Sequence, residues 1–231
     1  FTGTDENGDP AGLEVDIAYA LGEYLDREIE IVNTDFSMLI TSMETGEADV
    51  VISDMTIKEE RKEKVDFSEP YLYGRTLALV NKDFAEKSHV TNEMAPEEFF
   101  GIEGERVVGL AGTISVSVPQ SYGVEVEEVT EIASALMEIN QNTADVLVGA
   151  NTILGDHEGI KEYSQSAMAV KKGNTELLEQ LNSFVEFMYE DGGFYMEAGD
   201  KYDQAIGEYL QDESKGLEYM IYPPEGGVPE V

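Results

Sequence analysis

The segment 54–61 carries the side chains best suited to binding an organic acid. It follows an apolar strand expected over residues 50–52, so Asp54 and Thr56 enter a loop and a short helix returns Arg61 to the same rim. An arginine fork beside a hydroxyl group and backbone N–H groups can hold a carboxylate through paired hydrogen bonds. The alternative is a salt bridge between Arg61 and one of many surface acids, which composition alone favours.

Gly112 and Thr113 form a second candidate site, between a strand expected over 106–110 and a following helix. Helix N termini carry unpaired N–H groups and partial positive charge, which attract carboxylates. An ordinary threonine N-cap is the alternative. A further strand, expected over 145–148, ends at Ala150 and Asn151. Ligands of open α/β sheets bind off the carboxyl ends of the strands, so these loops line a shared cleft if two such units face each other.

Two acidic segments suggest metal binding, but neither supports it. In the calcium loop of a helix–loop–helix site, position six is glycine and position twelve is glutamate; a loop starting at Asp5 places Pro10 and Asp16 there. His157 stands alone between two acids, a pattern more typical of a solvated loop. The sequence therefore predicts no metal site and no cofactor.

The charge of the chain excludes several classes of partner. Fourteen Lys and Arg against 49 Asp and Glu give a net charge of −35, which repels nucleic acids and anionic membranes. The chain has no cysteine and two histidines. It therefore offers almost no residues for thiolate chemistry, Ser-His-Asp catalysis or a multi-histidine metal site. No apolar run approaches the roughly 20 residues that span a bilayer.

The spacing of apolar residues predicts an α/β protein with two similar units. The first unit has a helix carrying Ile17, Leu21 and Leu25, a strand over 28–32, a short helix ended by Gly46 and a strand over 50–52. The second has strands over 106–110, 124–129 and 145–148 and a helix over 132–139. A strand over 167–170, a long helix from Leu177 and a helix over 195–210 follow.

Read in order, these segments resemble family 3 of the bacterial extracellular solute-binding proteins, the polar amino-acid receptors of ABC transporters. The most specific stretches run from Met55 to Arg61 and from Val65 to Tyr71. The resemblance also includes Asp5-Glu-Asn-Gly8, Gly12-Leu-Glu-Val-Asp16, Asp35-Phe36, Gly46-Glu-Ala-Asp49, Val107 to Thr113 and Asp191-Gly192. It therefore covers nearly the whole chain.

The resemblance implies a two-lobed periplasmic-binding-protein-like fold of type II, each lobe a mostly parallel sheet flanked by helices, joined by two crossover strands. Lobe 1 would be residues 1–80 and 167–231, and lobe 2 residues 81–166. Phe36 would stack on the ligand, Arg61 would pair with its α-carboxylate, and Thr56 and the loop around Thr113 would add hydrogen bonds. The predicted ligand-binding residues are Phe36, Asp54, Met55, Thr56, Arg61, Gly112, Thr113, Ile114, Ala150 and Asn151.

The sequence departs from the family pattern at residues that matter for the ligand. Many amino-acid receptors have an aspartate for the ligand ammonium where this chain has Ala150, followed by Asn151. The family more often has a small residue at the position of Asp54, so we expect Asp54 to supply the anionic partner instead. Ile114 replaces the second hydroxyl of the turn after Gly112, with Ser115 nearby.

The beginning of the sequence is also unusual for this family, which has a strand before the position of Phe1. Either that strand lies outside the sequence, or the strand-like segment 217–223 replaces it, as in a circular permutation. Pairing of residues 219–222 as a strand would favour the second alternative.

The sequence therefore predicts an extracytoplasmic solute-binding protein, periplasmic or lipid-anchored at the cell surface, and not an enzyme. A monomer would capture a small zwitterion, an amino acid or close analogue, by hinge closure and deliver it to an ABC transporter permease. One alternative is the ligand-sensing domain of a membrane receptor kinase or cyclase. Another is a periplasmic dehydratase of the cyclohexadienyl type, for which Asp54 or Glu14 could be the general acid.

Overall fold

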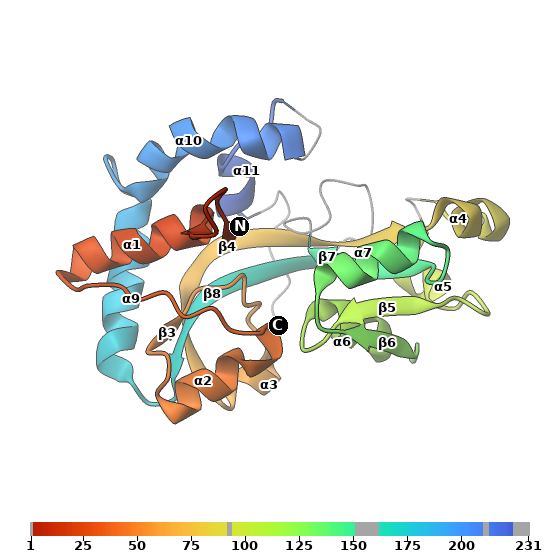
Figure 1. Ribbon diagram of the computed structural model, residues 1–231, viewed down its shortest axis with the longest axis horizontal. Helices are drawn as coiled ribbons and strands as arrows, with labels where there is room; N and C mark the ends of the chain where they lie inside the picture. Colours follow the sequence, from red (N-terminus) through yellow and green to blue (C-terminus); the bar gives the residue numbers. More distant parts are fainter. Residues whose placement is uncertain (1, 92–93, 151–161, 210–212, 224–231) are drawn as a thin grey trace. The chain divides into compact units, whose positions relative to one another are not determined.

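The computed structural model of the chain describes residues 2–91, 94–150, 162–209 and 213–223 (Figure 1). Internal contacts divide the chain into two compact units. Unit 1 consists of Phe1–Thr34, Met38–Gly74 and Ser164–Val231, and unit 2 of Asp35–Ser37 and Arg75–Tyr163. The lobes predicted from the sequence, divided at residues 80 and 166, stay a prediction.

Unit 1 begins with a small hairpin and then alternates helices with short strands. Its elements are β1 (Gly3–Thr4), β2 (Pro10–Ala11), α1 (Leu13–Leu25), α2 (Leu39–Thr45), β3 (Val50–Val51), α3 (Glu59–Lys62), α9 (Thr175–Met188), α10 (Phe194–Tyr209) and α11 (Glu218–Ile221). Two long strands, β4 (Val65–Val80) and β8 (Glu162–Lys171), belong partly to each unit. Within unit 1 the strand order is β3–β8–β4, and β3 is antiparallel to β8.

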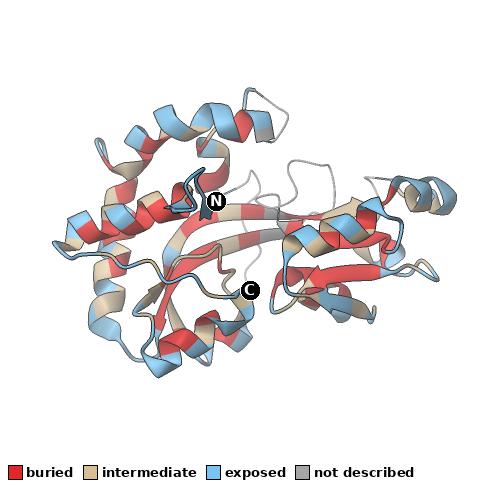
Figure 2. Cartoon of the chain, viewed as in Figure 1, coloured by how far each residue is buried: buried red, intermediate tan, exposed pale blue. Residues whose placement is uncertain are grey.

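Helix α1 forms over the apolar stripe that was predicted from the sequence. Leu13, Ile17 and Leu21 are all at most 3% exposed and pack with residues of α9 and α10 in one core cluster. Asp26, in the left-handed conformation, ends the helix. Figure 2 shows the buried residues of α1 on one side of the helix and exposed ones on the other. Burial of this stripe, rather than intrinsic helix propensity, stabilises such a helix.

Unit 2 is a sheet with helices on its faces. Its strands β5 (Val107–Leu110), β6 (Val126–Val129) and β7 (Val146–Ala150) join β4 in the order β4–β7–β5–β6. Strand β5 is parallel to β6 and β7, whereas β4 is antiparallel to β7. The helices are α4 (Lys82–Ser88), α5 (Pro96–Phe99), α6 (Ile114–Ser121) and α7 (Ile132–Asn140).

The apolar strands of unit 2 bury side chains on both faces of the sheet. Val108 and Leu147 pack with Ala135 and Ile139 of α7 on one face. Val107, Val146 and Val148 pack with Phe99 and Phe100 on the other. Neighbouring residues of a strand point to opposite faces, so a strand covered on both sides must be apolar throughout. This arrangement confirms the predicted α/β class.

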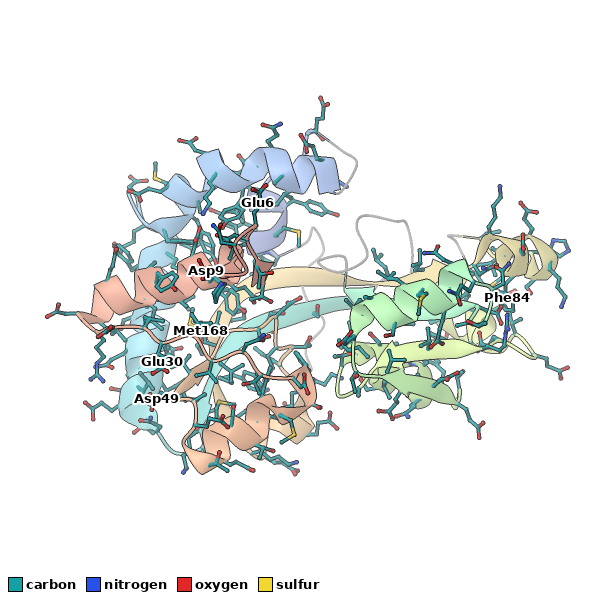
Figure 3. The ribbon with its side chains drawn as sticks, in the orientation of Figure 1. Glu6, Asp9, Glu30, Asp49, Phe84 and Met168 are labelled. Carbon is teal, nitrogen blue, oxygen red and sulfur yellow. The ribbon has the colours of Figure 1, made fainter. Side chains whose placement is uncertain are left out.

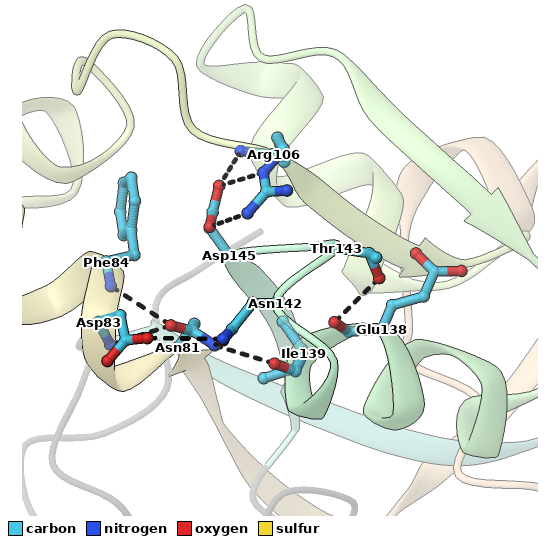
Figure 4. A network of polar contacts seen from close by, with 9 residues as sticks. All are labelled: Asn81, Asp83, Phe84, Arg106, Glu138, Ile139, Asn142, Thr143 and Asp145. Carbon is cyan, nitrogen blue, oxygen red and sulfur yellow. Dashed lines mark hydrogen bonds and ion pairs between the residues drawn. The ribbon is translucent and has the colours of Figure 1, made fainter.

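A polar network anchors the end of unit 2 where β4 meets α4 (Figure 4). The Asp145 carboxylate accepts hydrogen bonds from Arg106 Nε at 2.8 Å, Arg106 Nη2 at 2.6 Å and the Arg106 backbone N–H at 3.0 Å. Asn81 caps α4, accepting from the N–H groups of Asp83 and Phe84, and donates to the Ile139 carbonyl at 2.9 Å. These contacts tie together segments distant in sequence.

Two sequence expectations are wrong. Residues 28–32 alternate in burial, with Ile29 and Ile31 half-buried, but they form no strand; alternation shows which side chains face inward and does not supply a strand partner. Residues 218–221 form α11 rather than a strand, because Met220 and Ile221 enter the core of unit 1 from one helical turn. The alternative of a permuted strand there is therefore excluded.

The excess negative charge lies on the surface. Glu6, Asp9, Glu30 and Asp49, labelled in Figure 3, are exposed side chains of unit 1, whereas Met168 is fully buried. Exposed carboxylates are hydrated and need no partner. The few buried charged groups therefore stand out from the background of acids.

Candidate functional site

The turn after β3 holds three of the predicted ligand-binding residues. Asp54 has a φ of 43°, a left-handed conformation uncommon for residues other than glycine. Thr56 forms a β-bridge with Ser166 of β8, and the N–H of Ala167 donates to the carbonyl of Met55 at 3.2 Å. The turn is thus attached to β8 along its length, and the Met55 side chain is buried in unit 1.

Arg61 lies on α3 and returns to this turn, as expected. Only 5% of the residue is exposed, and Nη1 donates to the carbonyl of Thr56 at 2.7 Å. By contrast, the Lys and Arg side chains of the ion pairs that the structure describes are 43–87% exposed. Burial lowers the pKa of the Arg61 guanidinium, although arginine stays charged at any physiological pH. Arg61 is therefore buried, unlike the cations of these surface salt bridges.

A second cation lies in the same segment. Burial, followed by the charge of Arg61, lowers the pKa of Lys58 to about 8. The charge of Arg61 thus reaches Lys58, while Glu60 acts on both groups in the opposite direction; the two cations lie in one segment of a chain whose net charge is −35. An anionic group can be attracted here although the rest of the surface repels it.

Glu14 joins this turn from α1. The residue is 1% exposed, and its Oε1 accepts from the Asp54 N–H at 2.5 Å and from the Tyr71 hydroxyl. Burial, and next the charge of Asp54, raise the pKa of Glu14 to about 7. From the sequence, Glu14 was expected only as a general acid of the enzyme alternative. Its spacing to Ile17 and Leu21 places it on the apolar face of α1, a signal that could have identified a buried carboxyl group.

Tyr71 and Ser166 complete the surroundings of Asp54 and were not predicted. The Tyr71 hydroxyl is also 3.2 Å from the Asp54 N–H, and the Ser166 hydroxyl donates to Asp54 Oδ1. They come from β4 and β8, 17 and 112 residues from Asp54. No local pattern in the sequence pairs them with Asp54.

In unit 2 the predicted residues after β5 form a capped helix start. Gly112 has a φ of 78°, which glycine adopts without strain. Thr113 caps α6 by accepting from the N–H of Ser115 at 3.1 Å, and its hydroxyl donates to the carbonyl of Leu110 at 2.7 Å. Ile114 is 9% exposed. The Thr113 hydroxyl thus has the N-cap role that the sequence left open as an alternative.

Phe36 lies near Gly112. It begins a short 3₁₀ helix, Phe36–Met38, and Asp35–Ser37 group with unit 2. A Cβ atom added to Gly112 would lie 3.9 Å from Cδ1 of Phe36 and 3.5 Å from Cα of Ser37. The fold therefore brings two of the predicted ligand-binding residues together.

Ala150 ends β7, where its backbone pairs with that of Thr76 on β4. Asn151 and the segment around His157 lie outside the described residues. The structure thus brings together Asp54, Met55, Thr56 and Arg61 in unit 1, and Phe36 with Gly112 in unit 2.

Other kinds of site find little support in the described part of the chain. No group of three or more Asp, Glu or His there could hold a metal ion. None of the helices in that part has the length and apolar character needed to cross a membrane. An open cavity of about 510 Å³ lies beside the end of α1 and contains none of the predicted site residues; it is lined by Tyr19, Gly22, Glu23, Asp26, Arg27, Glu28 and Ile29.

Residues 1–202 match the family model of the bacterial extracellular solute-binding proteins, family 3. The L-cystine-binding protein TcyJ of Escherichia coli is 27% identical over 205 residues, covering 83% of this chain and 74% of that protein. The ABC transporter glutamine-binding protein GlnH of Bacillus subtilis is 25% identical over 225 residues, covering 90% and 75%.

The solved structures that resemble this chain include amino-acid-binding proteins as well. The holo arginine-binding protein ArgBP of T. maritima is 30% identical, with a TM-score of 0.73 and coverage of 87% of this chain and 89% of that chain. The ancestral amino acid-binding protein AncCDT-1, described as a precursor of cyclohexadienyl dehydratase, is 28% identical, with a TM-score of 0.75 and coverage of 87% and 89%. This likeness confirms the predicted two-lobed fold.

Proposed function

This chain belongs to family 3 of the bacterial extracellular solute-binding proteins, and on that premise we propose that it captures an amino acid or a close analogue and delivers it to an ABC transporter permease outside the cytoplasm. The relatives named above bind cystine, glutamine or arginine. They support a solute-binding role and leave the ligand of this chain to experiment.

The observation that carries the proposal is the burial of Arg61 beside the carbonyl of Thr56. Keeping a guanidinium away from water costs free energy, which an organic anion offsets when it binds. The neighbouring Lys58, whose pKa burial and the Arg61 charge lower, adds to the positive potential. In our proposal Arg61 pairs with the α-carboxylate of the ligand, and Thr56 adds a hydrogen bond.

The other predicted residues complete the proposed binding mode. Asp54 accepts the ligand ammonium and so replaces the aspartate that many relatives have at the position of Ala150. Phe36 stacks on the apolar part of the ligand. The other lobe would contact the ligand through Gly112, Thr113, Ile114 and Asn151. Where a side chain already has a hydrogen-bond partner in the protein, as that of Thr113 does, the backbone groups of the residue would bind the ligand.

The proposed mechanism is hinge closure between lobes divided at about residues 80 and 166. A ligand shifts an equilibrium between an open and a closed form only if it binds one of them more tightly. Contacts that both lobes make to one zwitterion meet that condition. A permease that recognises the closed form would then receive loaded protein selectively.

A second candidate function has one observation in its favour. Glu14 is a buried carboxyl group whose pKa is raised to about 7 by burial and by the charge of Asp54, and a general acid works best with a pKa near the working pH. AncCDT-1, a similar structure, is described as a precursor of cyclohexadienyl dehydratase. Turnover of prephenate or arogenate by the purified protein would support this candidate; no turnover would exclude it.

The proposed function is tested by ligand screening. We expect one or more of the common L-amino acids, L-cystine or their amides to raise the melting temperature, because a ligand at 100 to 1,000 times its Kd adds about 3–4 kcal/mol to the unfolding free energy. Asp54→Ala should abolish the response, whereas Asp49→Ala, a change of an exposed acid, should leave it intact. No response to any zwitterion, or an unchanged response in Asp54→Ala, would contradict the proposal.

A further inference from the structure

Three segments of unit 1 meet at one carboxyl group. Glu14 Oε1 accepts from the backbone N–H of Asp54 at 2.5 Å and from the hydroxyl of Tyr71. Glu14 comes from α1, Asp54 from the turn after β3 and Tyr71 from β4. Tyr195 of α10 supports this arrangement, since its hydroxyl donates to the Tyr71 carbonyl at 2.6 Å. The carboxyl group is therefore held in one position by buried contacts.

The second oxygen of Glu14 is in a different situation. Oε2 is buried, and no residue in the described part of the chain hydrogen-bonds to it. A buried carboxylate oxygen without a donor is costly. The cost is smaller if the group keeps its proton, because a neutral carboxyl group is less costly to bury than a carboxylate, or if a cation arrives nearby.

Asp54 is held on both its backbone and its side chain. Its φ of 43° lies in the left-handed region, which aspartate adopts more readily than most residues. Glu14 and Tyr71 bind its amide, and Ser166 donates to Oδ1. Glu14 and Tyr71 thus hold the Asp54 backbone, and Ser166 holds its carboxylate.

The charged and titratable groups that face Glu14 are mostly acidic. Burial and then the Asp54 charge raise the pKa of Glu14 to about 7, while the Tyr71 hydroxyl and the Asp54 amide lower it. The Glu14 charge in turn raises the pKa of Tyr71 and Tyr195, where burial is the larger cause. Protonation of Glu14 therefore removes a repulsion with Asp54.

We propose that Glu14 is a positioning residue for ligand capture, which orients Asp54 and releases its own proton to the solvent when an ammonium group binds to Asp54. The proposal rests on the proposed function, because it takes Asp54 to be the partner of the ligand ammonium. The bond that breaks is the O–H bond of Glu14, and the proton passes to the buffer. The ligand and the protein are otherwise unchanged.

The proposal predicts how affinity depends on pH. A bound ammonium offsets the Asp54 charge, which favours the ionised form of Glu14. Binding and deprotonation are then linked, so the affinity falls as the pH drops below neutral, by at most about tenfold per pH unit for one proton. Above the Lys58 pKa of about 8, loss of the Lys58 charge should weaken binding independently of Glu14.

Calorimetric titration with L-arginine and L-glutamine, across neutral pH and in two buffers of different ionisation enthalpy, measures this linkage. We expect wild-type protein to release up to one proton per ligand just below neutral pH. Glu14→Gln should release none and show a Kd that does not change with pH below the Lys58 pKa of about 8. Glu105→Gln is the matched control, because burial and the Asp145 charge raise the pKa of Glu105 to about 7 as well. Glu105 belongs to unit 2, so this variant should release protons and bind ligand as the wild type does.

A second measurement does not need a ligand. The backbone amide of Asp54, followed by NMR in the unliganded protein, should shift with a midpoint near neutral pH in the wild type and in Glu105→Gln. The shift should disappear in Glu14→Gln and change in Tyr71→Phe, which keeps the ring. A flat Asp54 amide in the wild type would overturn the positioning role.

The two experiments separate the two proposals. If either amino acid binds without proton release, the proton linkage is overturned and the proposed function stands. If neither amino acid binds but the Asp54 amide titrates with Glu14, binding of these two amino acids is refuted and the contact from Glu14 to Asp54 is supported. Proton release that persists in Glu14→Gln would assign the proton to another group and contradict the proposal.

Discussion

Arg61 and Arg106 show two ways in which one acidic chain uses a guanidinium. Arg106 is about half exposed and holds the Asp145 carboxylate through Nε and Nη2 (Figure 4). Arg61 is 5% exposed, and its Nη1 donates to a backbone carbonyl. The Asp145 hydrogen bond raises the pKa of Arg106, whereas burial lowers that of Arg61.

The difference is one of burial: Arg106 joins two segments at the surface, whereas Arg61 is the buried guanidinium to which we propose a role in binding. A bidentate pair at a protein surface joins two segments and tolerates water around it. A buried guanidinium is costly unless further hydrogen bonds surround it. The two units can also be compared through one acid each. The pKa of Glu14 in unit 1 and the pKa of Glu105 in unit 2 are both raised to about 7.

The largest expected effect is on ligand binding. Arg61→Ala should weaken binding of the amino acid identified by screening about a thousandfold, about 4 kcal/mol, because the ligand carboxylate loses a charged partner in a buried setting. Arg106→Gln should leave the Kd unchanged. Calorimetry on both variants, with melting temperatures to confirm folding, checks the comparison. Equal losses in the two variants would show that the two arginines do not differ in role.

The next largest effect is on the unfolding free energy of the unliganded protein and its dependence on pH, through Glu14 in unit 1 and Glu105 in unit 2. The folded-state pKa of Glu14, about 7, lies above its ordinary value of 4.5, so between these pH values the folded state retains a proton that the unfolded state has lost. Wild-type stability therefore decreases as the pH rises through this window, by about 3 kcal/mol from this group. Glu14→Gln should lack that decrease.

Glu105→Gln gives the comparison with unit 2. Its pKa is raised in the same direction. Both carboxylate oxygens are buried, but the residue as a whole is partly exposed, so solvent screening should reduce the effect. Denaturant unfolding at several pH values measures both variants against the wild type. A larger effect in Glu105→Gln than in Glu14→Gln would reverse our ranking of the two sites.

The smallest expected effect is on the stability of unit 2. Asp145→Asn should lower the unfolding free energy by about 2 kcal/mol, because three hydrogen bonds to Arg106 lose their ionised acceptor. The Arg106 contact lowers the pKa of Asp145, so this contribution is complete above its ordinary value of 3.8 and is lost as the pH falls through the folded-state pKa. Ligand affinity should not change; a large loss of affinity would give the network a role in binding.

Most of the elements could be predicted from the sequence because their patterns are local. The helical stripe of Ile17, Leu21 and Leu25 and the apolar strand around Leu147 each depend on neighbours within a few residues. The positions of Asp54, Thr56 and Arg61 on one rim followed from a strand, a turn and a short helix in succession. The strand expected over 28–32 was wrong because alternation does not show whether a strand partner exists.

The sequence by itself determined the α/β class, the family and the segment that carries the buried arginine. Only the tertiary structure decided that Glu14, Tyr71 and Ser166 surround Asp54, and that the Thr113 hydroxyl caps a helix. The physical reason is distance along the chain: Ser166 and Asp54 are 112 residues apart. Their contact depends on the packing of β8 and α1 around the turn, which no local periodicity encodes.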